Sequence, residues 1–221
     1  MKLQKLGGYA AIASLCAYIV GAVYAIFIQP NGFFGDPAKA MAVISASPGE
    51  FYAIYLLFMV CSILGFIMFT ALHERMHAKA TYFSHMMLIA ASASTVIWVT
   101  EDIFRIVSIG MIITPQDLST YRPFYVIAEG LHQAGGHALG WGWLFSGCAI
   151  LVTRSFSRVL GWISLVTGII LIPHFFLMQI EFTFTIPIFY LTYFSATIWI
   201  GIALIRQKQP LQTVIEMDDA V

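Results

Sequence analysis

The chain has 221 residues, of which 60% are hydrophobic and only 10% are charged, and its mean hydropathy is +0.85. Soluble domains average about 45–50% apolar and about 25% charged residues, so this composition excludes an ordinary soluble globule. It indicates a multi-pass membrane protein instead. Lysine and arginine together number 11, as do aspartate and glutamate, and the resulting net charge of zero excludes a basic surface for nucleic acid.

Six apolar segments follow one another along the chain, each close to the ~20 residues that a hydrocarbon core of ~30 Å requires. Backbone groups in lipid must bond within their own segment, so each segment is predicted to be a helix. The predicted spans are 7–29, 51–72, 82–104, 128–152, 159–180 and 185–205. Residues 1–209 are therefore predicted to form one all-α transmembrane domain, a bundle of six helices, followed by a disordered tail at 210–221.

Basic residues are unevenly divided between the loops that join these spans. With the N-terminus inside, eight Lys and Arg residues lie on the inner side and two, Lys39 and Arg122, lie on the outer side. This bias predicts a protein of the cytoplasmic membrane with both termini in the cytoplasm. The first segment also has features of a signal peptide, with a cleavage site at residues 23–25, but its apolar run is longer than is typical, so we interpret it as a span. In the outer loop, residues 38–45 are predicted to form a short interfacial helix capped by Asp36.

Ionisable side chains within a span are costly and mark either a functional site or a buried partner. The third span carries Glu101, Asp102 and Arg105. Glu101 and Arg105 are four residues apart and share a helix face, whereas Asp102 points about 100° away. We expect an ion pair near the outer end, with Arg105 extending to the lipid headgroups. A ligand-binding role for the pair is the alternative.

The fourth segment is rich in polar and small residues. Glu129, His132, Gly136 and Gly140 lie along one stripe of the predicted helix. Gly136 and Gly140 form a seam of the small-xxx-small type, through which a membrane-protein partner is able to dock. Glu-x-x-His is also half of the motif that builds carboxylate-bridged metal sites, but no second copy follows, so the metal signal is weak.

These side chains are predicted to meet in the outer half of the bundle. Glu101, Asp102, Glu129 and His132 are joined there by His174 of the fifth span. Such a cluster is able to bind a divalent metal ion through Glu129, His132 and His174, or to perform acid/base chemistry through Glu101, Glu129 and His132. Separate pairs of satisfied side chains between helices are the structural alternative.

A second candidate lies at the cytoplasmic end of the second span. His73-Glu74-Arg75-Met76-His77 matches H-E-x-x-H, in which two imidazoles one turn apart bind zinc and the glutamate acts as a base. His85 is placed to supply a third ligand. The motif lies in a short basic loop with no acidic third ligand, so His73 and His77 are the less favoured metal site.

A basic loop leads into the fifth predicted span through Leu160-Gly-Trp and small residues up to Gly168. Together with residues 5–11 and 72–75, this stretch resembles one bacterial multi-pass membrane family, known as domain of unknown function 4386. The resemblance implies six helices in a cytoplasmic membrane and identifies no catalytic residues.

We therefore expect an integral membrane protein with an outward-facing, buried pocket of Glu, His and Asp side chains that binds a small or lipophilic ligand or a metal ion. Two alternatives stay open. One is a membrane-embedded enzyme that uses Glu129 and His132, and the other is an accessory structural subunit of a larger membrane complex.

Overall fold

The computed structural model describes residues 3–28, 36–113, 117–177 and 185–206, and every regular element within these ranges is an α-helix. The predicted all-α fold is thereby confirmed, and each predicted span coincides with a helix. The helices are α1 (Leu3–Ile28), α2 (Pro37–Ala46), α3 (Pro48–Met76), α4 (Thr81–Ile113), α5 (Leu118–Thr153), α6 (Arg158–Leu177) and α7 (Thr185–Arg206). The predicted tail at 210–221 lies outside the described residues.

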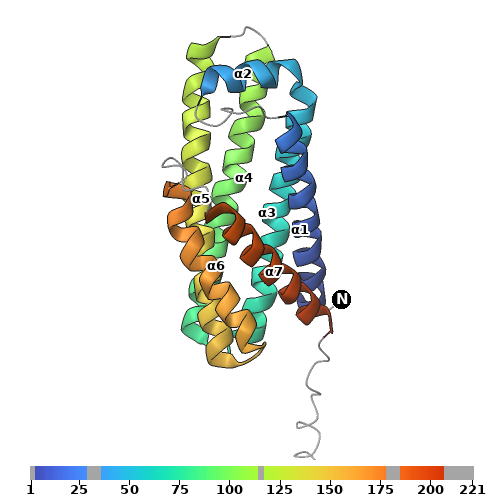
Figure 1. Ribbon diagram of the computed structural model, residues 1–221, viewed down its shortest axis with the longest axis vertical. Coiled ribbons are helices and arrows are strands. Elements are labelled where there is room, and N and C mark those ends of the chain that lie inside the picture. Colours follow the sequence, from blue (N-terminus) through green and yellow to red (C-terminus); the bar gives the residue numbers. More distant parts are fainter. Residues whose placement is uncertain (1–2, 29–35, 114–116, 178–184, 207–221) are drawn as a thin grey trace, which may run out of the picture.

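The six longer helices alternate in direction along the long axis of the molecule (Figure 1). The start of α1, the end of α7 and the loops α3–α4 and α5–α6 therefore lie at one end, which we call the terminal end. The short helix α2 crosses the opposite, distal end. Helices α6 and α7 cover only the half of the bundle nearer the terminal end, so the distal half consists of α1, α3, α4 and α5 under α2 (Figure 1).

Four helices are long and apolar enough to cross a membrane: α1, α3, α4 and α7. Helix α6 has a shorter apolar stretch, Arg158–Pro173. Helix α5 has 36 residues and is about 54 Å long at 1.5 Å per residue, but its polar side chains and glycines make it less apolar than the other four. Composition and length thus identify four candidate spans among the described residues, and α5 and α6 are not among them.

Local sequence signals explain where two of the helices begin. Asp36 caps α2 by accepting hydrogen bonds from the backbone N–H groups of Ala38 and Lys39, at 3.0 and 3.2 Å. This confirms the predicted short helix and its cap, and its place at a membrane interface stays a prediction. Asp117 caps α5 in the same way, accepting from the hydroxyl and the backbone N–H of Ser119, and these hydrogen bonds hold the pKa of the Asp117 carboxyl below its usual value.

The apolar interior is divided into two cores. The larger one fills the half nearer the terminal end and includes Leu72, Met87, Trp143 and Leu171. The smaller one lies beneath α2 at the distal end, and its buried members are Ala40, Ile44, Phe51, Ile54, Tyr55, Ile109, Ile112, Tyr121 and Tyr125. The polar residues of α4 and α5 described below lie between these two cores.

Glycines let α5 and α6 approach closely. A Cβ added at Gly140, Gly147 or Gly168 would lie within 2.8 Å of backbone atoms of the facing helix. The seam predicted for a partner protein is thus used within the chain: Gly140 packs against Ile172 of α6. A partner that docks through Gly140 would have to displace α6.

Candidate functional site

Helix α4 places Glu101 and Arg105 one turn apart, and both side chains point into the bundle. Arg105 Nε donates to Glu101 Oε1 at 2.7 Å, which confirms the predicted pair. The prediction that Arg105 extends to the headgroups is wrong, because the residue is only 8% exposed. Its guanidinium is held inside the bundle by a second carboxylate.

That second carboxylate comes from α5. Arg105 Nη2 donates to Glu129 Oε1 at 2.8 Å, and His132 Nδ1 lies 3.1 Å from Glu101 Oε2. Glu129 and His132 are one helical turn apart, so they reach the two ends of the Glu101–Arg105 pair. We call these four residues the ion-pair cluster. It joins α4 to α5 by two charge-assisted contacts, Arg105 with Glu129 and His132 with Glu101.

Aromatic rings flank the cluster on both sides. The ring of Tyr55, from α3, faces the Arg105 guanidinium at 5.7 Å, a cation–π distance. The ring of Trp98 stacks on His132 with 6.4 Å between centroids, and its Nε1 donates to the His132 carbonyl oxygen at 3.2 Å. Trp98 occupies space that Gly135 leaves free, since a Cβ there would lie 2.4 Å from the indole.

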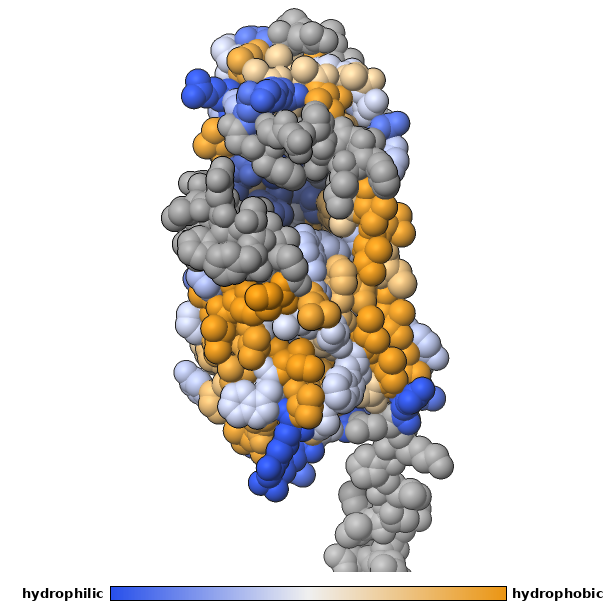
Figure 2. Space-filling view, in the orientation of Figure 1, coloured by the Kyte–Doolittle hydropathy of each residue, from blue (hydrophilic) through white to orange (hydrophobic). Residues whose placement is uncertain are grey.

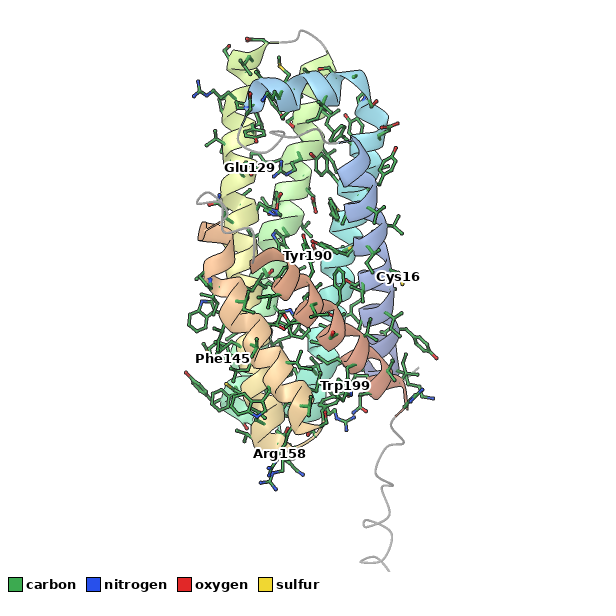
Figure 3. The ribbon with its side chains drawn as sticks, in the orientation of Figure 1. Cys16, Glu129, Phe145, Arg158, Tyr190 and Trp199 are labelled. Atoms are coloured by element: carbon green, nitrogen blue, oxygen red, sulfur yellow. The ribbon has the colours of Figure 1, made fainter. Side chains whose placement is uncertain are left out.

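The cluster is buried at one edge and open at the other. The side chains of Glu101 and Arg105 are 6% and 9% exposed, whereas those of Glu129 and His132 are 23% and 36% exposed. In Figure 3 the labelled Glu129 lies on α5 above the upper ends of α6 and α7. Figure 2 shows hydrophilic surface at this level, beside the apolar surface of α1. Since the distal core lies beneath α2, the open edge faces sideways rather than toward the end of the bundle.

The depth of the cluster follows from the packing of α5 on α6. His137 Nδ1 lies 3.1 Å from the Ile172 carbonyl oxygen, and α6 ends five residues later at Leu177. Because α5 runs antiparallel to α6, the residue five positions before His137, which is His132, lies level with Leu177. The ion-pair cluster thus begins at the level where α6 stops, about 30 Å from the start of that 20-residue helix.

Asp102 is buried beside the cluster without joining it. The residue is 5% exposed, and within the described part of the chain its carboxyl makes no hydrogen bond or ion pair. It lies close enough to Glu101, Arg105 and the Cys61 thiol of α3 for their charges to interact. The sequence placed Asp102 on a different face from Glu101, and the structure agrees.

Helices α5 and α6 carry two further histidines, His137 and His174. His137 donates to the α6 backbone and accepts from Trp141 Nε1 at 3.1 Å, so it serves the contact between α5 and α6. His174 belongs to α6, but its side chain lies outside the described residues. Its predicted place in the pocket, and the metal site of His132, His174 and Glu129, therefore stay predictions.

At the terminal end, the H-E-x-x-H motif forms a compact group of imidazoles. The rings of His73 and His77 stack at 5.4 Å, and His85 meets His73 edge-on at 4.9 Å. Each Nδ1 lies within hydrogen-bond distance of a backbone carbonyl oxygen of its own hairpin. Within the described ranges, however, no three His, Cys, Asp or Glu side chains are arranged to bind a metal ion, here or at the ion-pair cluster.

Comparison with known proteins adds no relative: no family model, curated protein or solved structure matches the chain. The resemblance to domain of unknown function 4386 is neither supported nor contradicted and stays a prediction.

Proposed function

We propose that this protein spans the membrane six times, with both termini in the cytoplasm. The alternation of the six helices supports this, because it brings most basic residues to the terminal end: Lys5, Arg75, Lys79, Arg154, Arg158 and Arg206. Lys39 and Arg122 lie at the distal end, in agreement with the positive-inside rule. A membrane-impermeant maleimide on intact cells tests the orientation in a cysteine-free background: it should label Lys39→Cys and spare Lys79→Cys, and the reverse pattern would refute it.

We further propose that the ion-pair cluster is the binding site for a small lipophilic ligand. The observation that carries this proposal is a charged layer between two apolar cores that is open along one lateral edge, at Glu129 and His132. Ion pairs in the interior of a bundle are costly and do little for stability compared with apolar packing, so an exposed edge on such a layer favours a functional site. A lateral opening at the depth where α6 ends suits a ligand that partitions into lipid.

Acid/base catalysis by Glu129 is less well supported. Glu129 Oε1 accepts a hydrogen bond from Arg105, and a carboxylate held by a guanidinium is a poor proton acceptor. A metal ion is also disfavoured at the cluster, since Glu129, the carboxylate predicted to bind it, is engaged with Arg105.

Thermal unfolding in lipid nanodiscs tests the binding proposal. We expect at least one of benzylamine, benzyl alcohol and benzoate to raise the Tm of the wild-type protein by about 5 °C or more near saturation. The Glu129→Gln variant should lose most of this increase, because it alters the open edge of the cluster. Glu74→Gln, an exposed glutamate at the terminal end, is the matched control and should respond like the wild type. If no compound raises the Tm, or if Glu129→Gln responds fully, the cluster is structural.

A further inference from the structure

The terminal end carries an excess of positive charge that the ion-pair cluster does not use. Five of its basic residues are exposed, and none of them forms an ion pair within the described ranges: Lys5, Lys79, Arg154, Arg158 and Arg206. Among the described residues of this end, Glu74 is the one acidic side chain. Figure 3 shows the labelled Arg158 extending away from the bundle here. The terminal end is thus an unneutralised cationic surface.

The part of this surface between α5 and α6 is fixed in shape. Arg75 Nη2 of α3 donates to the Ser155 carbonyl oxygen at 3.0 Å, and the Arg75 guanidinium lies 4.5 Å from the centre of the Phe156 ring. The Ser155 N–H donates to Thr153 Oγ1 at 3.2 Å. Arg154 ends α5 with a φ of 53°, in the left-handed region that favours glycine. A strained backbone kept for an exposed arginine suggests that its side chain is used.

We call Val152, Arg154, Arg158 and Val159 the α5–α6 corner. Arg154 and Arg158 supply its positive charge, and the valines that flank them are 58% and 57% exposed. Helix α6 begins at Arg158 with no acidic residue in its first turn, so its own sequence does not neutralise the partial positive charge of its N-terminus. The corner therefore suits a segment that carries both carboxylates and apolar side chains.

The chain carries such a segment beyond α7. Residues 214–219 read Val-Ile-Glu-Met-Asp-Asp, in which three carboxylates alternate with apolar side chains. Helix α7 ends with Arg206 at the terminal end, the same end as the corner (Figure 1). The charge and the apolar content of 214–219 both complement the α5–α6 corner.

The corner is within reach of this segment. Ten residues lead from Arg206 to Glu216, and they span up to about 33–36 Å when extended. A bundle of six helices is about 30 Å across, because each helix is about 10–12 Å wide and neighbouring axes lie about 8–10 Å apart. A segment tethered at this length has an effective concentration in the millimolar range, which allows several individually weak charge pairs to hold it.

We propose that residues 214–219 dock on the α5–α6 corner, where the carboxylates of Glu216, Asp218 and Asp219 pair with Arg154 and Arg158. This inference goes beyond the proposed function and does not depend on it. The contact is electrostatic and exposed, so salt weakens it. Anionic lipid headgroups share the chemistry of the carboxylates, and the test separates the two.

The test measures a distance by electron spin resonance between nitroxide labels at Ala78→Cys and Ala220→Cys, in a cysteine-free background of the full-length chain. Ala78 is exposed in the α3–α4 loop, whose helix α3 contacts the α5–α6 loop through Arg75. In nanodiscs of uncharged phosphatidylcholine, docking predicts one narrow distance distribution. Raising the salt from about 0.02 M to about 0.5 M should at least double its width, because the Debye length falls from about 20 Å to about 4 Å.

Charge variants decide whether the corner holds the segment. Changing both arginines of the corner to glutamine, Arg154→Gln with Arg158→Gln, should at least double the width at low salt. The matched control is Lys39→Gln with Arg122→Gln, two basic residues of the distal end, and it should leave the width unchanged. A broad distribution in the wild type, or equal widths in the two variants, would overturn the proposal.

A charge exchange and a change of lipid complete the test. Arg154→Glu with Arg158→Glu should release the segment, and adding Glu216→Lys, Asp218→Lys and Asp219→Lys should restore the narrow distribution, which a variant that merely misfolds does not allow. In nanodiscs that contain phosphatidylglycerol the segment should stay docked at low salt. Its release there would assign the corner to lipid headgroups and overturn the proposal.

Discussion

Replacement of Arg105 by methionine is expected to lower the free energy of unfolding by about 3–5 kcal/mol. Arg105 is 8% exposed, and its guanidinium pairs with both Glu101 and Glu129, so its loss leaves two carboxylates close together without their common cation. Methionine fills much of the same volume, which keeps the loss of packing small and isolates the loss of charge. Unfolding by a denaturing detergent, followed by tryptophan fluorescence, measures the change.

The matched control for this variant is Lys39→Met. Lys39 also belongs to an ion pair, with Asp36 at 3.8 Å, but the two side chains are 59% and 41% exposed. Exposed pairs contribute about 0–1 kcal/mol, so this variant should be nearly as stable as the wild type. Adding Glu129→Gln to Arg105→Met should restore part of the lost stability, because one unpaired charge is removed. Equal effects of Arg105→Met and Lys39→Met would show that the cluster does not hold α4 and α5 together.

Replacement of Gly147 by alanine is expected to cost about 2–3 kcal/mol, by forcing α5 and α6 apart. An added Cβ would lie 2.6 Å from the backbone nitrogen of Leu165 and 2.8 Å from the Gly161 carbonyl oxygen. Both contacts involve backbone atoms, which cannot rotate away as a side chain would. The same unfolding measurement reports the change.

Gly130 provides the control for this variant within the same helix. A Cβ at Gly130 would have no neighbour within 4 Å, so Gly130→Ala should be neutral or stabilising by up to about 1 kcal/mol through helix propensity. If Gly147→Ala were as stable as Gly130→Ala, the close packing of α5 on α6 would be refuted.

The sequence was sufficient for the helices and for the pair within α4, because both depend on local spacing. Apolar runs of about twenty residues predict the helices, and a separation of four residues brings Glu101 to Arg105. The contact of Glu129 with Arg105 is different in kind. It depends on how far α5 is shifted along α4. The Trp98 indole fixes this shift by packing against Gly135 and bonding to the His132 carbonyl oxygen, and no pattern within either helix encodes it.

The glycine seam shows the same limit. The seam of Gly136 and Gly140 predicts that some helix approaches α5 closely, but small residues do not specify which one. In the structure the neighbouring helix is α6, and its Gly161 and Gly168 lie at the contact with α5. Asp102 is the converse case. Its place on a different face of α4 from Glu101 follows from the sequence. That it has no bonded partner among the described residues is known only from the packing of the bundle.

Photolabelling tests the central claim, that the ion-pair cluster is a ligand site, most directly. The probes are aryl-diazirine derivatives of benzylamine and benzyl alcohol, applied to the protein in nanodiscs and located by peptide mass spectrometry. The account predicts adducts at Tyr55, Trp98 and His132 around the cluster, and their loss in excess unlabelled compound. Adducts confined to side chains on the outer surface of the bundle, such as Tyr82 and Leu191, 68% and 70% exposed, and not displaced by excess compound would contradict it.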